Sequence, residues 1–321
     1  MKKSVSKFLK IALPLALGIF LIIWSYSRFS AAQLTEIKTH FKAADYTYVI
    51  LAVVLSILSH LFRAVRWNLM LAPLGYQPKL LNNFMAISIA YLMNIFIPKS
   101  GEVSRGIVIN KYEEVPFDKA FGTIISERVI DLVFLLGFTL VALWLQYDVL
   151  YEYLTQLIPI AKLAYLFFGV VAFGVLFLLF LKYSRSALRQ KIKGFLSGLR
   201  DGVFTIFTMK KKGLFLLQTC IIWGLYLLSF YVSLFALEAT SGIALGTIII
   251  TFVVGSFSFA FTNSGFGSYP FFVAGILAVF GVAETVGTAF GWIVWTSNIV
   301  TLIAFGGLSL LFLPLYNQKK V

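Results

Sequence analysis

The sequence predicts an all-α, polytopic integral membrane protein with about six to eight membrane-spanning helices plus broken or re-entrant segments. Three observations support this fold class. Of the 321 residues, 60% are hydrophobic and only 12% are charged, the mean hydropathy is +0.91, and the apolar residues are gathered into long runs. A soluble domain has a far smaller apolar share and more charge. We expect residues 1–321 to form a single transmembrane domain.

Six apolar runs are predicted to cross the bilayer as helices. They are residues 12–26, 46–67, 124–147, 160–181, 214–237 and 287–313. The first run follows the basic sequence MKKSVSKFLK and resembles a signal peptide, with a weak cleavage site at Ser30-Ala31-Ala32. It is longer than the apolar part of a usual signal peptide, so we expect an uncleaved first helix. Residues 27–45 then form a short external segment.

The positive charges indicate which ends of the helices face the cytoplasm. Residues 182–212 carry nine lysines and arginines against one acid, Asp201, which predicts a cytoplasmic basic loop. Apolar residues recur in it at helical spacing, so we expect it to lie along the inner leaflet. We predict a multi-pass protein of the inner or plasma membrane with both termini cytoplasmic. The net charge of +14 is explained by this asymmetry, and nucleic-acid binding is the lesser interpretation.

Two further apolar stretches, about residues 83–110 and 243–282, are interrupted. The first has about 15 apolar residues before Pro98 and Gly101, fewer than the ~20 that a full span needs. The second is broken by Thr-Asn-Ser-Gly-Phe-Gly-Ser at 262–268. Because the basic segments on either side of each stretch fix the parity of the crossings, we expect the first stretch to enter and leave from the cytoplasm and the second to enter and leave from outside. Each is either a re-entrant hairpin or a pair of tilted crossings.

Interrupted segments that open to opposite faces are typical of inverted-repeat transporters. The two halves of the chain show no convincing residue-level similarity, so an inverted repeat is one interpretation. The other is that the glycines and serines of 263–268 only allow close helix packing.

Residues 96–131 place charges among strongly apolar segments, where an unpaired charge costs on the order of 3 kcal/mol. Two interpretations remain open: an internal ion-pair network that stabilises the fold, or a site for an anionic group. Five cations face three acids, a surplus of two positive charges; the cations are Arg63, Arg66, Lys99, Arg105 and Arg128, and the acids are Glu102, Glu127 and Asp131. Because the arginine fork binds phosphate oxygens bidentately, the surplus suits a phospholipid headgroup.

The candidate substrate-binding residues come from this charged region and from the two breaks. We expect Arg105 and Arg128 to hold phosphate and the arginines of 63–66 to draw it from the inner leaflet. The acids would orient the arginines or meet a headgroup amine, and the neutral residues would supply hydrogen bonds. The full set is Arg63, Arg66, Glu102, Arg105, Glu127, Arg128, Asp131, Asn94, Asn263, Ser264, Gly265 and Gly267.

The sequence offers little to a catalytic or metal site. Cys220 is the only cysteine, and His40 and His60 are too few for a zinc site. We therefore expect no catalytic residue, no metal and no cofactor. The alternatives are a membrane enzyme acting on a lipid phosphate or polyprenyl-linked sugar, with Glu127 or Asp131 as general base, or a membrane scaffold that recruits a partner through the basic loop.

Four motifs carry a family resemblance: SHLFRAVRW at 59–67, IPKSGEVSR at 97–105, SERVID at 126–131 and SGFG at 264–267. With them the chain resembles the membrane region of the lysylphosphatidylglycerol synthase family, also described as flippase-like. The resemblance implies movement of aminoacylated or related lipids between leaflets, while a separate soluble domain attaches the amino acid. Residues 1–321 leave no room for that domain, so synthase activity is not implied.

The glycine-rich motif departs from that family pattern, since relatives often have a proline before it and a glutamate after it. Substrate identity therefore stays open. The expected function is a lipid flippase or transporter that moves a phospholipid-type or lipid-linked substrate between leaflets. The expected partners are membrane lipids, with anionic phospholipid headgroups foremost, and no nucleic acid; a homo-oligomer is compatible with the sequence.

Overall fold

The computed structural model describes residues 2–157, 160–183, 186, 189–190 and 209–318. Within these residues every regular element is a helix, which confirms the all-α prediction. Most of the predicted basic loop at 182–212 lies outside the described residues, so its position along the inner leaflet stays a prediction.

Four of the described helices are long and apolar enough to cross a bilayer, which confirms a multi-pass membrane protein. They are α3 (Tyr46–Leu71), α6 (Phe117–Leu145), α10 (Lys212–Leu234) and α14 (Glu284–Tyr316). A fifth span results if α1 (Lys2–Ser27) and α2 (Ala31–Ala43), which meet at 112°, are counted together. The run at 160–181 corresponds to α8 (Ile160–Tyr183), which follows α7 (Tyr147–Leu157).

Most of the segment at 27–45 forms α2 because its start carries a complete capping box. The Ser30 amide donates to the Gln33 side chain at 2.9 Å, and the Gln33 amide donates back to the Ser30 hydroxyl at 3.3 Å. On its other face, Glu36 accepts a hydrogen bond from Thr285 of α14 at 3.0 Å. The helix therefore fastens the first span to the last one.

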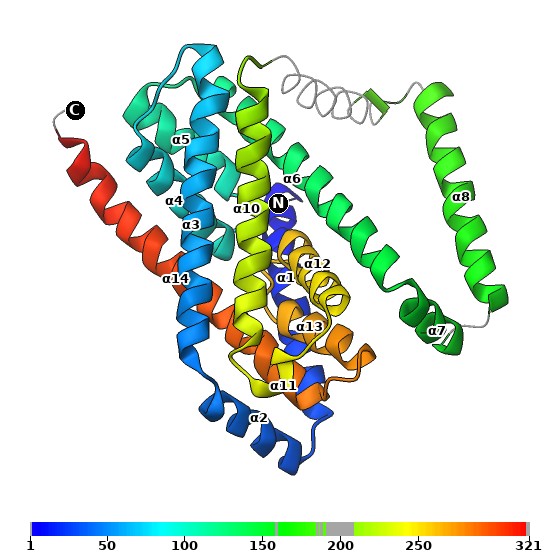
Figure 1. Ribbon diagram of the computed structural model, residues 1–321. Coiled ribbons are helices and arrows are strands. Elements are labelled where there is room, and N and C mark those ends of the chain that lie inside the picture. The colour runs from blue at the N-terminus through cyan, green and yellow to red at the C-terminus, as the bar shows by residue number, and fades with distance from the viewer. Residues whose placement is uncertain (1, 158–159, 184–185, 187–188, 191–208, 319–321) are drawn as a thin grey trace.

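Each interrupted stretch forms a pair of short helices. Hairpin 1 consists of α4 (Leu80–Phe96) and α5 (Gly101–Glu113), and hairpin 2 of α12 (Leu245–Phe261) and α13 (Ser268–Val279). All four helices have 17 residues or fewer, too short for a full span of about 20. Figure 1 shows that the hairpins enter from opposite ends of the helix bundle and that their turns meet near its middle.

The second half of the bundle repeats the first in inverted orientation. A long helix, a hairpin and a longer helix follow one another in each half. The lengths are 26, 17, 13 and 29 residues for α3, α4, α5 and α6, and 23, 17, 12 and 33 for α10, α12, α13 and α14. In Figure 1 each element of one half runs opposite to its counterpart. The backbone thus contains an inverted repeat, as the two interrupted segments indicated.

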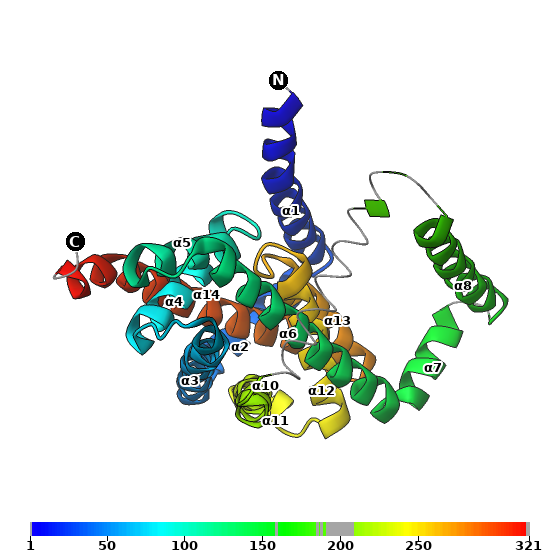
Figure 2. The same cartoon turned by 90° about the horizontal axis from the view of Figure 1, so that it is seen from above.

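Helix α14 packs against both hairpins. Its Gly291 lies against the Pro270 backbone of hairpin 2, and its Gly306 lies against Leu92 of hairpin 1, with no room for a larger side chain at either position. Figure 2 shows α1 and α8 projecting outside the group formed by the two repeats. The repeats therefore build the centre of the molecule, and α14 connects the two hairpins.

Candidate functional site

The charged residues of α3, α5 and α6 converge at one place in the bundle. Helical spacing of three or four residues puts each pair of charges on one helix face, as for Glu127 and Asp131 of α6. Ion pairs join seven side chains, called here the arginine cluster: Arg63, Arg66, Glu102, Arg105, Glu127, Arg128 and Asp131. The sequence prediction that these residues share one site is consistent with this geometry.

Glu127 is the centre of the cluster, and its side chain is 0% exposed. Arg105 binds it bidentately, with Nη1 donating to Oε1 at 3.2 Å and Nη2 donating to Oε2 at 3.0 Å. Arg63 donates to the same Oε1, and the Arg66 guanidinium lies 3.3 Å from it. One buried carboxylate thus pairs with three guanidiniums, in a place where an unpaired charge is very costly.

Asp131 completes the neutralisation one turn further along α6. Its Oδ2 accepts from Arg63 at 2.8 Å and its Oδ1 accepts from Arg66 at 3.0 Å. The Arg128 guanidinium lies 3.6 Å from it. Each of the two arginines of α3 therefore bridges both acids of α6 and fixes the two helices to each other.

Neutral side chains fix the planes of the guanidiniums. The Arg105 guanidinium stacks 3.7 Å above the Trp67 ring, whose Nε1 donates to Thr123 at 2.8 Å. Arg66 donates to Thr219 at 3.0 Å, and Arg63 donates to Tyr226 at 3.2 Å. Trp67 stands in the motif SHLFRAVRW, but no sequence signal marks Thr219 or Tyr226, because their role depends on where α10 packs.

Arg128 and Glu102 are the accessible edge of the cluster. Their side chains are 36% and 21% exposed, and Arg128 Nε lies 3.2 Å from Glu102 Oε1. The remaining five members are buried. Lys99, counted with them from the sequence, is exposed in the turn of hairpin 1 and outside the seven joined residues. The positive surplus of the cluster therefore falls from two charges to one, and Arg128 is its most exposed arginine.

Asn94 stabilises the turn of hairpin 1. Its side-chain oxygen accepts from the Gly101 amide at 2.7 Å. A Cβ on Gly101 would lie 2.3 Å from the Ala90 carbonyl oxygen, so only glycine lets α5 begin this close to α4. Asn94 therefore satisfies backbone at the break, which bilayer lipid cannot do.

Asn263 joins the two hairpins. Its Nδ2 donates to the Ile95 carbonyl oxygen of hairpin 1 at 2.8 Å, and the side chain is buried. Its Oδ1 has no hydrogen-bond partner among the described residues. The turns thus meet through one polar contact, beside the first turn of α5 that carries Glu102.

The turn of hairpin 2 needs left-handed backbone at Ser264, Gly265 and Gly267, with φ of 52°, 73° and 67°. The Ser264 carbonyl accepts from Trp295 Nε1 at 2.9 Å. A Cβ on Gly267 would lie 2.2 Å from the carbonyl oxygen of Gly18 in α1. Gly267 therefore allows close packing against α1, as one interpretation of this motif expected. The same motif also breaks the helix.

Equivalent positions of the repeat hold the two hairpins. Arg128 is the twelfth residue of α6 and pairs with Glu102 of hairpin 1, while Trp295 is the twelfth residue of α14 and binds Ser264 of hairpin 2. The contact is an ion pair in the first half and a neutral hydrogen bond, from an indole to a backbone carbonyl, in the second.

Residues 11–306 match the family model described as the lysylphosphatidylglycerol synthase TM region. The chain belongs to this family. Among curated relatives, a UPF0104 membrane protein of Methanocaldococcus jannaschii is 36% identical over 29% of this chain and 29% of its own length. A UPF0104 membrane protein of Methanothermobacter thermautotrophicus is 27% identical over 51% of this chain and 48% of its own length. The chain thus matches less than half of either relative, and no solved structure matches it.

In this lysylphosphatidylglycerol synthase TM-region protein, the predicted site residues separate into two adjoining groups. The charged ones form the arginine cluster, whereas Asn94, Asn263, Ser264, Gly265 and Gly267 build the turns of the hairpins. The two groups adjoin at the start of α5, where Gly101 binds Asn94 and the next residue, Glu102, faces Arg128. The site therefore combines a charged wall with two broken helices.

Proposed function

We propose that the protein moves a phospholipid-type headgroup between the leaflets of the bilayer without changing it covalently. The observation that carries this proposal is the meeting of two oppositely directed hairpins beside a cluster that has one more arginine than acids and an accessible arginine at its edge. A headgroup crosses the hydrocarbon slowly because its polar atoms lose water there. Broken helix ends and a cationic edge replace that water.

The accessible arginine is the expected contact for lipid phosphate. The shorter of the two ion pairs of Arg128 is with Glu102, which lies in the first turn of α5 and is itself partly exposed. A phosphate that approaches Arg128 replaces Glu102 and uses the surplus positive charge. Each of the three buried arginines is already bound to Glu127, and Arg63 and Arg66 also to Asp131, so they hold the wall in place and are not free for ligand.

The same pairing argues against the membrane-enzyme alternative. A general base needs a carboxylate that is free to accept a proton from the substrate. Glu127 is bound by three guanidiniums and Asp131 by two close ones, so neither candidate base is free. The proposal therefore assigns the acids to positioning.

The test is lipid exchange in vesicles that contain the purified protein. Vesicles of phosphatidylcholine and phosphatidylglycerol carry a chain-labelled fluorescent phosphatidylglycerol, and a membrane-impermeant quencher reports which leaflet holds it. We expect exchange with the wild type and about tenfold slower exchange for Arg128→Gln, because a charge-assisted hydrogen bond contributes about 1.5–3 kcal/mol. The matched control is Lys119→Gln, an exposed cation of the same helix.

Chromatography of the recovered lipids separates the alternatives. A chemically altered lipid would establish an enzyme, and absence of both exchange and product would favour a scaffold. Either outcome overturns the proposed function. Equal exchange rates for wild type and Arg128→Gln would remove the arginine cluster from the transport path.

A further inference from the structure

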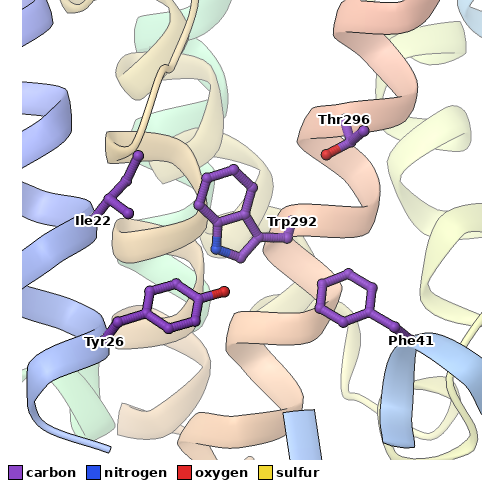
Figure 3. Close-up of a pocket in the computed structure, with 5 residues that line it drawn as sticks. All are labelled: Ile22, Tyr26, Phe41, Trp292 and Thr296. Carbon is purple, nitrogen blue, oxygen red and sulfur yellow. The ribbon is translucent and has the colours of Figure 1, made fainter. Parts of the chain in front are cut away.

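A recess of about 450 Å³ opens on the side of the bundle between α1, α2 and α14. Ile22 and Tyr26 of α1 form one wall, Trp292 and Thr296 of α14 form the other, and Phe41 of α2 closes one end. Figure 3 shows the Trp292 indole extending from α14 toward Ile22 and Tyr26. No residue of the arginine cluster lines this recess, so it is a separate feature.

The recess has the shape of a slot that follows the helices. Ile22 and Tyr26 are four residues apart, as are Trp292 and Thr296, so each wall is one helical turn on a single face. The slot thus runs along both helices over a rise of about 6 Å, and its volume lies within the roughly 300–1,000 Å³ of small-molecule sites. A flexible, narrow, apolar group fits such a space better than a compact polar one.

A much smaller space of about 10 Å³, the room of one water molecule, adjoins the slot on the side of hairpin 2. It shares Ile22, Tyr26 and Trp292 with the slot and also borders Gly267 and Thr288. The Thr288 hydroxyl is buried and has no hydrogen-bond partner among the described residues. This side of the slot therefore has one free hydroxyl donor and room for a single polar atom, such as the carbonyl oxygen of an ester.

We propose that this slot holds one acyl chain of a phospholipid, with the ester end toward Gly267, while the headgroup passes the turns of the hairpins. The inference rests on the proposed function and extends it to the hydrophobic part of the substrate. The occupant follows from the surroundings: Ile23 beside the slot is 64% exposed and Val300 on α14 is 58% exposed, and because both are apolar, both face lipid chains. A slot open to that layer fills with hydrocarbon.

The test uses a phosphatidylglycerol with a photoactivatable group on one acyl chain, reconstituted with the full-length protein in phosphatidylcholine vesicles. Mass spectrometry maps the labelled residues. We expect the label on Tyr26 and Trp292, and about tenfold less of it in Ile22→Trp, which corresponds to about 1.4 kcal/mol of binding free energy. The matched control, Ile23→Trp, adds the same ring to the adjacent, lipid-facing position and should leave labelling unchanged.

A second pair of variants controls for misfolding of Ile22→Trp. Thr296→Phe fills the slot from α14, and Val300→Phe adds the same ring one turn away on the lipid side. The slot variants should also slow lipid exchange, while melting temperatures match those of their controls.

Three results decide the inference. Equal labelling of Ile23 and Trp292, or labelling that Ile22→Trp leaves unchanged, means annular lipid only and overturns it. A disulfide between copies of a Tyr26→Cys variant with Cys220 replaced also overturns it, because the slot is then an interface between copies. Slot-specific labelling without lipid exchange supports the acyl-chain site and overturns the flippase proposal alone.

Discussion

At the scale of single residues, burial separates the acids that hold the arginine cluster together from the one that the proposed phosphate would replace. Glu127 is fully buried among three guanidiniums, whereas Glu102 faces one half-buried arginine at the edge. From the sequence alone, a structural network and a phosphate site were both open interpretations, and the positive surplus favoured the phosphate site. The geometry assigns the structural role to the buried core of the cluster and leaves the edge for ligand.

The first prediction concerns Glu127→Gln. The change leaves three buried guanidiniums with one fewer negative charge, and breaking a buried ion pair typically costs about 3–5 kcal/mol. We expect a loss of unfolding free energy in that range, measured by denaturant titration in mixed micelles. Glu102→Gln is the control and should lose about 1 kcal/mol or less, because its pair is partly exposed. Similar losses for both variants would contradict the central role of Glu127.

The second prediction concerns Arg105→Lys. Lysine keeps the charge but cannot form both hydrogen bonds to Glu127 or stack flat on Trp67. We expect a destabilisation of about 1.5–3 kcal/mol, the contribution of a hydrogen bond to a charged group. Arg128→Lys at the exposed edge should cost much less in the same titration. A lysine variant as stable as the wild type would mean that only charge matters at position 105.

At the scale of elements, the hairpins exist because their turns satisfy backbone groups that a bilayer would leave unpaired. Side chains do this in both turns: Asn94 and Ser100 in hairpin 1, and Thr262 with Trp295 in hairpin 2. Glycine supplies the close approaches at which any other residue would clash. A hairpin of two short helices is therefore stable here although neither helix spans the membrane.

The third prediction tests the packing of hairpin 2 against α1. Gly267→Ala places a Cβ 2.2 Å from the Gly18 carbonyl oxygen and forces alanine into left-handed backbone. We expect destabilisation by more than about 1 kcal/mol. The control is Gly275→Ala within α13, where a Cβ meets no atom within 4 Å and helix propensity favours alanine. Melting temperatures of the two variants, compared with wild type, decide the matter.

At the scale of the whole molecule, the inverted repeat gives each face of the membrane one hairpin opening. Hairpin 1 opens at the end where α3 finishes, and hairpin 2 opens at the end where α10 finishes. The positive-inside rule applied to the sequence puts the first end in the cytoplasm.

The fourth prediction follows from that arrangement. In a background with Cys220 replaced, Gln77→Cys before hairpin 1 and Ser241→Cys before hairpin 2 both stand at exposed positions. A membrane-impermeant thiol reagent should label Gln77→Cys only from the cytoplasmic side and Ser241→Cys only from outside. Labelling of both from one side would contradict the inverted topology.

Much of this architecture could be predicted because it depends on local sequence. The six apolar runs correspond to helices, and the hairpin breaks fall where Pro98, Gly101 and the glycine-rich motif cannot continue a helix. Helix α2 was missed because it is too polar for a span, although its capping box from Ser30 to Gln33 is a local signal.

The partners within the site could not be predicted, because they depend on packing between distant helices. Nothing local indicates that Glu127 binds arginines from two other helices, that Thr219 and Tyr226 join the cluster, or that Lys99 lies outside it. Counting charges along the chain therefore overestimated the surplus of positive charge in the arginine cluster. The inverted repeat was equally invisible at the residue level, because its counterparts match in length and position but differ in chemistry.

The contact of α14 with both hairpins has a consequence for the leakage of protons and small ions across the membrane. Gly306 toward one end of the helix lies against Leu92, and Gly291 toward the other end lies against Pro270. A rigid tilt of α14 about a point between them would therefore move the two contacts in opposite directions. Loosening hairpin 1 from one end presses the other end onto hairpin 2. Under the proposed function, such a tilt would seal one face of the membrane whenever the other is open, which leaves protons and small ions no continuous path while a lipid crosses.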